Sequence, residues 1–241
     1  MDETLTQLWV YLAREPLLHL SLTLLAYLAG SLLYQRSGQS PLLNPVLLAV
    51  TLLVGLLLVT GTPYPDYFEG AQFIHFLLGP ATVALAVPLY QHLGRIRAQL
   101  LPILGGLLAG SLTAIVSAMG LVWVLGGSRE LLLSMAPKSV TTPIAMGIAE
   151  KLGGLPSLTA VLVIMTGITG AVTGPLLLRA LGIGSRSAQG LALGVASHGI
   201  GTARAFQIDD LAGAFSGLAM GLNALLTALL VPLLARLFGL A

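Results

Sequence analysis

Apolar residues run along this chain in long blocks, and short polar stretches separate the blocks. A helix needs about 20 mostly apolar residues to cross the hydrocarbon core of a membrane. About seven blocks approach that length, and no alternating strand pattern is visible. They cover roughly residues 17–34, 44–61, 70–91, 101–126, 156–179, 187–203 and 211–238. Since helices satisfy their own backbone hydrogen bonds in lipid, the pattern predicts an all-α polytopic membrane protein.

Composition supports this prediction and limits the function. Of the 241 residues, 56% are hydrophobic and 8% are charged, against about 25% charged residues in a soluble domain. Hydrated side chains are too few to cover the exterior, so we expect one membrane domain, residues 1–241, facing the lipid bilayer. The 11 basic and 9 acidic residues form no basic stripe, and nucleic acid is not an expected partner. Cysteine is absent, which excludes thiolate metal sites.

The stretch "APKSVTTPIAMGIAEK" is an exception to the apolar pattern. Residues 138–150 are too short and too polar for an ordinary span, and a proline interrupts any helix through the first of them. Helix starts attract anions, and a lysine and three hydroxyls surround this one. The candidate ligands of an anion are Lys138, Ser139, Thr141 and Thr142. The alternative is an interfacial loop with capping hydroxyls and a lysine that reaches the headgroups.

A second stretch, "GVASHGIGTARA", interrupts another apolar block in the same way. Glycine loosens the helix there, His198 can titrate near neutral pH, and Arg204 can bind a carboxylate through two parallel hydrogen bonds. Alternatively, His198 bonds a neighbouring carbonyl and Arg204 lies among lipid headgroups. Two such stretches in one small membrane chain favour function, because ionisable groups in a membrane are costly. The candidate residues here are Ser197, His198, Gly199, Thr202 and Arg204.

Charge placement predicts a topology. If residues 138–150 enter and leave at one side while every other block crosses once, the acidic residues occupy one face. The opposite face then carries Arg36, Arg95, Arg97, Arg179, Arg186 and Arg236. The positive-inside rule makes that arginine face cytoplasmic and puts the N-terminus outside. A full crossing by residues 138–150 would scatter the arginines, so the re-entrant arrangement is preferred.

An internal repeat is a second expectation, and it conflicts with that topology. "LNPVLLAV" followed by Gly79-Pro80 is similar to "TTPIAMGI" followed by Gly174-Pro175. Transporters are often built from inverted repeats, but an inverted repeat would require residues 138–150 to cross. Asn44, in the first Asn-Pro pair, is expected to cap the helix that starts at Pro45, and we include it among the candidate binding residues.

Signatures of enzymes are missing from the sequence. There is no metal-binding histidine pair at helical spacing, no Walker loop and no nucleophile elbow. Ser197 and His198 are adjacent, so on a helix they point about 100° apart and cannot easily act as nucleophile and base. We therefore expect a protein that is not an enzyme and needs no cofactor or metal.

The stretches "GAQFIHFLLGPATVALAVPLYQ", "PKSVTTPIAMGIAEKLGGLPSLTAV" and "GLALGVASHGIGTARA" resemble the LrgB/CidB family of bacterial membrane proteins, over roughly residues 20–240. The resemblance implies the bacterial inner membrane and a small LrgA/CidA-like membrane partner. It also implies one of two functions. Some members are described as antiholin-like or holin-like regulators of murein hydrolase export and lysis, whereas others resemble carriers of pyruvate, glycolate or glycerate.

The two polar stretches favour the carrier, because a regulator needs helix packing but no buried lysine, histidine or arginine beside interrupted helices. We expect alternating-access transport of a small monocarboxylate, coupled to protons or cations, by a homodimer. Lys138 or Arg204 would bind the carboxylate, neighbouring hydroxyls would complete the site, and His198 would carry a proton. The antiholin-like regulator is the alternative.

Overall fold

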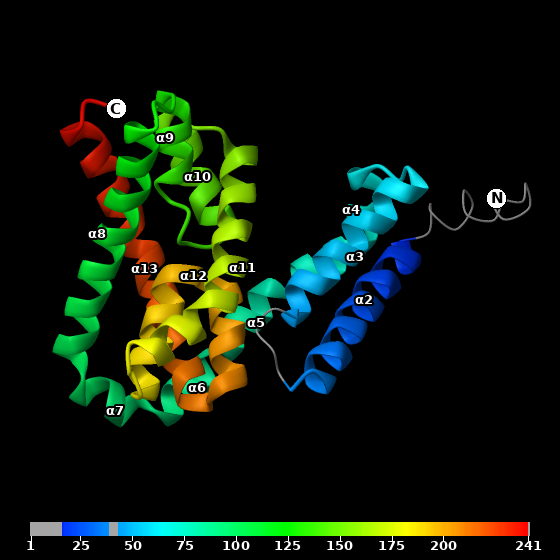
Figure 1. Cartoon of the computed structure of the whole chain (residues 1–241), viewed down its shortest axis with the longest axis horizontal. Helices are drawn as coiled ribbons and strands as arrows, with labels where there is room; N and C mark the ends of the chain where they lie inside the picture. Colours follow the sequence, from blue (N-terminus) through cyan, green and yellow to red (C-terminus); the bar gives the residue numbers. More distant parts are fainter. Residues whose placement is uncertain (1–15, 39–42, 241) are drawn as a thin grey trace, which may run out of the picture. The chain divides into compact units, whose positions relative to one another are not determined.

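The structure, a computed structural model, describes residues 16–38 and 43–240 (Figure 1). Helices joined by short turns and loops make up these residues, without a strand among them, so the all-α prediction is confirmed. The chain separates into two compact units, Met1–Ala84 and Leu85–Ala241. Residues 1–15, to which the prediction of an external N-terminus applies, lie outside the described part.

Five helical stretches are long and apolar enough to cross a membrane, in agreement with a polytopic protein. They are Pro16–Arg36, Tyr64–Gln91, Leu100–Val124, Pro156–Ala180 and Asp210–Leu237. Pro45–Thr60 is a shorter apolar helix. Of the seven predicted blocks, 44–61 and 187–203 therefore correspond to helices outside these five stretches, and the other five blocks match them.

The first unit packs helix α2 (Pro16–Arg36) against α3 (Pro45–Thr60) and α4 (Tyr64–Phe76), and α5 (Leu78–Ala84) follows. Helix α3 begins as expected, because Asn44 Oδ1 accepts hydrogen bonds from the N–H groups of Val46 and Leu47 at 2.9 and 3.2 Å. Between α2 and α4, the hydroxyls of Thr23 and Tyr67 lie 2.9 Å apart.

In the second unit, two long helices run side by side in the same direction. The unit contains α6 (Ala86–Gln91), α7 (Leu93–Ala98), α8 (Leu100–Val124), α9 (Arg129–Met135), α10 (Thr142–Leu152), α11 (Pro156–Ala180), α12 (Arg186–Ile208) and α13 (Asp210–Leu237). The starts of α8 and α13 meet in a buried cluster with α7, through Ile103, Phe215 and Ile96. We call this the α7 end. At the other end, the α9 end, the last turns of α8 and α13 pack against α9 and α10.

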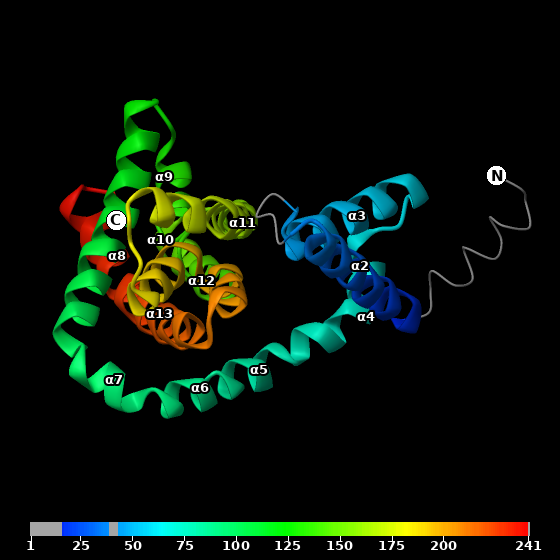
Figure 2. The same ribbon diagram turned by 60° about the horizontal axis from the view of Figure 1, so that its bottom comes forward.

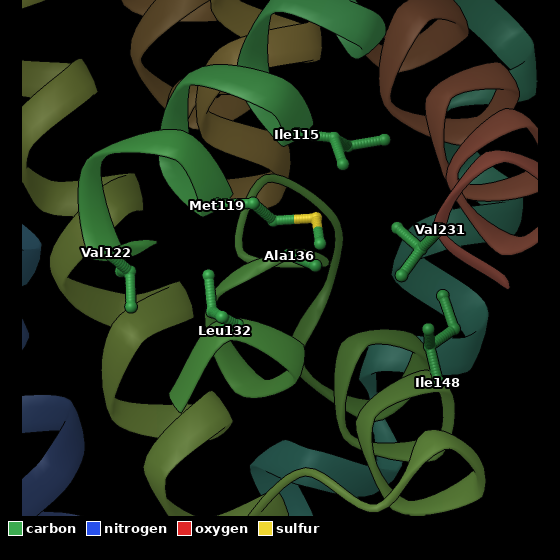
Figure 3. Close-up of a cluster of buried hydrophobic side chains, with 7 residues drawn as sticks. All are labelled: Ile115, Met119, Val122, Leu132, Ala136, Ile148 and Val231. Atoms are coloured by element: carbon green, nitrogen blue, oxygen red, sulfur yellow. The ribbon is translucent and has the colours of Figure 1, made fainter. Parts of the chain in front are cut away.

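Figure 3 shows the core of the α9 end, in which Met119, Leu132, Ile148 and Val231 come from α8, α9, α10 and α13. Helix α11 begins beside α9, where the Leu155 N–H donates to Ser134 Oγ at 2.7 Å. It ends in a cluster with the start of α13, through Leu178 and Ala212. Helix α11 therefore runs antiparallel to α8 and α13.

Helices α9 and α10 form the first hairpin, Arg129–Leu152. Its two ends lie together at the α9 end, where Arg129 approaches Gly153, and its tip is residues 136–141. The chain thus enters and leaves at one end, but over different residues than predicted: residues 138–150, which were expected to enter and leave by themselves, form only the tip and the returning limb.

Helix α12 is a second hairpin, and here the prediction of a span at 187–203 was wrong. The backbone leaves helical values at Ser197 (φ −136°, ψ 16°) and His198 (φ 42°, ψ −133°). A Cβ on Gly201 would lie 2.5 Å from the Leu193 carbonyl oxygen, although a straight helix separates residues eight apart by about 12 Å. A hydropathy profile shows only whether an apolar stretch is long enough to span a membrane, so it cannot detect that the chain reverses within two residues.

This reversal also corrects the predicted charge separation. Both ends of α12 lie at the α7 end, so Asp209 and Asp210 accompany Arg179 and Arg186 there, whereas Arg236 lies near the opposite end of α13. The acidic residues therefore do not all share one face. An excess of arginine at the α7 end remains.

Figures 1 and 2 show α12 packed beside α13 over most of its length. Glycines allow this close approach, since a Cβ on Gly190 or Gly194 would meet the backbone of α13 at Ala212 or Ser216. The second hairpin therefore rests on α13, with its tip halfway along that helix.

Candidate anion site at the tips of two hairpins

The tip of the first hairpin is a short irregular segment between α9 and α10. Backbone bonds from Lys138 N–H to the Met135 carbonyl and from Val140 N–H to the Pro137 carbonyl, both 3.2 Å, turn the chain. Helix α10 then starts after Thr141, whose side chain makes no capping bond. The Thr141 hydroxyl therefore does not cap α10, although the alternative interpretation, an interfacial loop with capping hydroxyls, expected such caps.

Lys138 is half-buried, and its Nζ donates to Ser139 Oγ at 3.3 Å. Ser139 itself is buried. Neither tip segment, 136–142 or 195–199, contains an acidic residue. A lysine beside the start of α10, where free N–H groups carry partial positive charge, makes this tip electropositive.

At the tip of the second hairpin, Ser197 and His198 are both buried. His198 Nε2 lies 2.9 Å from the Val163 carbonyl of α11. Since a carbonyl only accepts, Nε2 carries the hydrogen, and part of the alternative interpretation of His198 is confirmed. The Ser197 hydroxyl has no hydrogen-bond partner within the described residues, which is unusual for a buried polar group.

Glycines of α11 make room for this tip. A Cβ on Gly167 would lie 2.7 Å from the His198 ring, and a Cβ on Gly170 would overlap the Ser197 hydroxyl. Small residues at such spacing let membrane helices approach closely. The glycines therefore fix where the reversal lies along α11.

Asn223, in the middle of α13, joins the two tips. It is fully buried, and its Nδ2 donates to the Ser139 carbonyl at 3.3 Å and to the Val195 carbonyl at 3.1 Å. Its Oδ1 accepts from Ser111 of α8 and from Thr227 at 3.4 Å. One amide thus satisfies a carbonyl from each hairpin, and the two tips lie together halfway along α8, α11 and α13.

Several of the predicted site residues meet at this point. Lys138 and Ser139 lie on one tip and Ser197 and His198 on the other, and Asn223 bonds to both tips. Thr141, which precedes α10, and Thr142, its first residue, are half-buried, and Gly199 is exposed just beyond the reversal.

Other predicted residues have structural contacts or lie elsewhere. Thr202 Oγ1 donates to the His198 carbonyl at 2.9 Å and lies 3.0 Å from Ser216 Oγ, so it ties the hairpin to α13. Arg204 lines a cavity at the α7 end, beyond the tips. Asn44 belongs to the first unit, where it caps α3. Substrate binding by these residues stays a prediction.

The sequence analysis did not predict that Asn223 joins the two tips. It also missed a repeat that marks both hairpins. "LGGSR" precedes the first and "LGIGSR" precedes the second. Ser128 and Ser185 cap the two starts, accepting from Leu131 N–H and Ala188 N–H. Because α8 and α11 are antiparallel, this repeat is inverted. It differs from the Asn/Thr-Pro repeat predicted above.

Residues 23–237 match the model of the LrgB-like family. The chain belongs to this family. Membership in the LrgB-like family and the apolar helices together identify a multi-pass membrane protein. No solved structure matches the chain.

Relatives of this LrgB-like protein cover almost its whole length. The uncharacterized protein YxaC of Bacillus subtilis is 44% identical over 217 residues, which is 90% of this chain and 94% of YxaC. YwbG of the same organism is 39% identical over 89% of this chain and 95% of its own length. The holin-like protein CidB of Staphylococcus epidermidis is 34% identical over 93% of this chain and 97% of its own.

Proposed function

We propose that this LrgB-like protein is a secondary transporter of small monocarboxylates such as glycolate, glycerate or pyruvate. The observation that carries the proposal is the meeting of two hairpins from opposite ends at Asn223, beside a half-buried lysine. Burying Lys138 in a membrane protein is costly, and a bound anion would offset that cost.

The tips supply the groups that a small hydroxy or keto acid needs. Lys138 provides the charge for the carboxylate, and the α10 start adds N–H groups. The hydroxyls of Ser139, Thr141, Thr142 and Ser197 complete the donor set. Ser197 is the most specific of them, because its buried hydroxyl has no partner within the described residues. Since Arg204 lies at the base of its hairpin, the geometry favours Lys138 as the carboxylate ligand.

Opposed hairpins also suit alternating access, because each tip can separate from the site toward its own side. His198 is the proposed proton carrier, since protonation at Nδ1 would add a charge beside Lys138 and strengthen anion binding. We further propose the bacterial inner membrane, with the arginine-rich α7 end in the cytoplasm, an external N-terminus, a homodimer and an LrgA/CidA-like partner. No enzymatic activity and no cofactor are included in the proposal.

A second candidate function is regulation of murein hydrolase export and lysis. It is favoured by the relatives named holin-like protein CidB, at 34% identity. A regulator of this kind would depend on helix packing and assembly, and it would tolerate loss of the Lys138 charge.

Uptake in proteoliposomes separates the two functions. The purified protein should accumulate labelled glycolate, glycerate or pyruvate, and Lys138→Ala should reduce uptake at least tenfold, because a charge-assisted bond to the carboxylate is lost. The matched control is Lys151→Ala, since Lys151 is the only other lysine of the chain and lies exposed at the end of α10. Absence of uptake for all three acids, or equal uptake by both variants, would refute the proposed site.

A further inference from the structure

We propose that a cavity at the α7 end, separate from the hairpin tips, binds a phosphate group. The cavity has a volume of about 340 Å³ and lies between the end of α11 and the base of the second hairpin. Its lining includes Arg179, Arg186, Gln189 and Arg204. This inference does not depend on the transport function.

The three arginines come from separate parts of the fold, and the cavity lining contains no acidic residue. Arg179 lies in the last turn of α11, Arg186 begins α12, and Arg204 lies on the returning half of the hairpin. Like charges that converge on one cavity repel one another. An anion between them would remove that repulsion.

Two of the guanidinium groups are held by neutral amides. Arg186 Nη1 donates to Gln189 Oε1 and Arg204 Nη1 donates to Gln207 Oε1, both at 3.0 Å. Gln189 is fixed in turn by its Nε2, which donates to the Ile183 carbonyl at 2.6 Å. These bonds orient both arginines, and the Gln189 amide oxygen carries no charge that would neutralise Arg186.

The backbone adds donors to the same cavity. After Gly182, which has φ 69°, the turn leads into the first residues of α12, and both Gly184 and Arg186 line the cavity. The first N–H groups of a helix have no partner within the helix, and they favour negative charge. The arginines and this helix start therefore converge on one volume.

A phosphate group fits these donors better than a carboxylate does. It has three free oxygens and up to two charges, and guanidinium groups match its oxygens in pairs. Leu178, Ile183 and Ile208 add apolar side chains to the lining of the cavity. Basic pockets between membrane helices can bind anionic lipid headgroups, so either a phospholipid headgroup or a free phosphate could supply the group.

The test is thermal unfolding of the whole purified protein in neutral detergent. Separate titrations use sodium phosphate, dioctanoyl phosphatidylglycerol, dioctanoylglycerol without a phosphate, and sodium chloride at equal ionic strength. Phosphate or phosphatidylglycerol should raise the melting temperature, because a ligand that binds only the folded state stabilises it. Dioctanoylglycerol and chloride should not.

Arg179→Gln and Arg186→Gln should each weaken the response about tenfold in ligand concentration, as expected when one charge-assisted bond is lost. Both residues are exposed, so their replacement should leave folding intact. The control is Arg97→Gln, which removes an exposed arginine at the same end, outside the cavity lining.

The two sources of the phosphate group give different results. A response to sodium phosphate identifies a soluble ligand, and a response to phosphatidylglycerol alone identifies a lipid headgroup; either supports the site. No response to both ligands would overturn the proposal. It would also fail if Arg179→Gln and Arg186→Gln responded like Arg97→Gln.

Discussion

The two hairpins of the second unit reach the same point by different local structures. In the first, α9 and α10 are separate helices joined by the irregular segment 136–141, with Pro137 inside it and Pro143 in the first turn of α10. In the second, the chain reverses within Ser197 and His198. Prolines make the first interruption visible in the sequence, whereas the second depends on one residue with a positive φ and on glycines of another helix.

Both hairpins depend on α13, although they enter from opposite ends. Their only shared hydrogen-bonding side chain among the described residues is Asn223, which binds a carbonyl from each tip. Asn223 therefore serves both hairpins, whereas Gly170 and the backbone at His198 serve the second hairpin alone. The following substitutions test these roles.

The largest effect is expected from Asn223→Ala. It leaves two buried carbonyls without this donor, and unsatisfied buried groups cost about 1–3 kcal/mol each, although hydrogen bonds within membranes are often weaker. We expect a loss of about 2–4 kcal/mol in the free energy of unfolding in detergent, together with loss of uptake.

The control for this change is Asn44→Ala, because Asn44 is also a buried asparagine but only caps α3. Loss of a cap costs about 1 kcal/mol. Equal losses for the two variants would mean that Asn223 does not couple the hairpins.

An intermediate effect is expected from Gly170→Ala, which acts on the second hairpin alone. The added methyl would overlap the Ser197 hydroxyl, and overpacking of this kind costs about 1–3 kcal/mol. Measurement of the unfolding temperature should show the loss, and adding Ser197→Gly should restore much of it. Gly120→Ala is the control, because nothing lies within 4 Å of a Cβ at that position in α8. A loss that Ser197→Gly cannot reverse would contradict this explanation.

The smallest effect is the difference between two substitutions of His198. Both remove the hydrogen bond to Val163, but only glycine adopts φ 42° without strain. His198→Gly should therefore be more stable than His198→Ala by about 1 kcal/mol, as measured by unfolding in detergent. If alanine were the more stable, the left-handed backbone at the tip would be in doubt. For a proton carrier, uptake by both variants should also lose its dependence on pH.

The sequence predicted the long helices and both polar interruptions, because lipid imposes a minimum apolar length and polar groups in it are conspicuous. It could not predict the reversal of α12, since Gly167 and Gly170 of α11 accommodate that tip from a distance along the chain. Arg204 was expected beside Lys138 for the same reason. Without knowledge of the reversal, the sequence spacing between His198 and Arg204 did not show how deep in the membrane Arg204 lies. The cap that Asn44 places on α3 was predictable, because it involves only residues that are close in the sequence.

The reversal of α12 leaves three long helices, α8, α11 and α13, running from one end of the second unit to the other, while each hairpin returns to the end at which it starts. The turn between α11 and α12 and the last residues of α13, near Leu240, consequently lie at opposite ends of the unit. A ligand bound at one of these ends can therefore affect the other end only through the helices that join them.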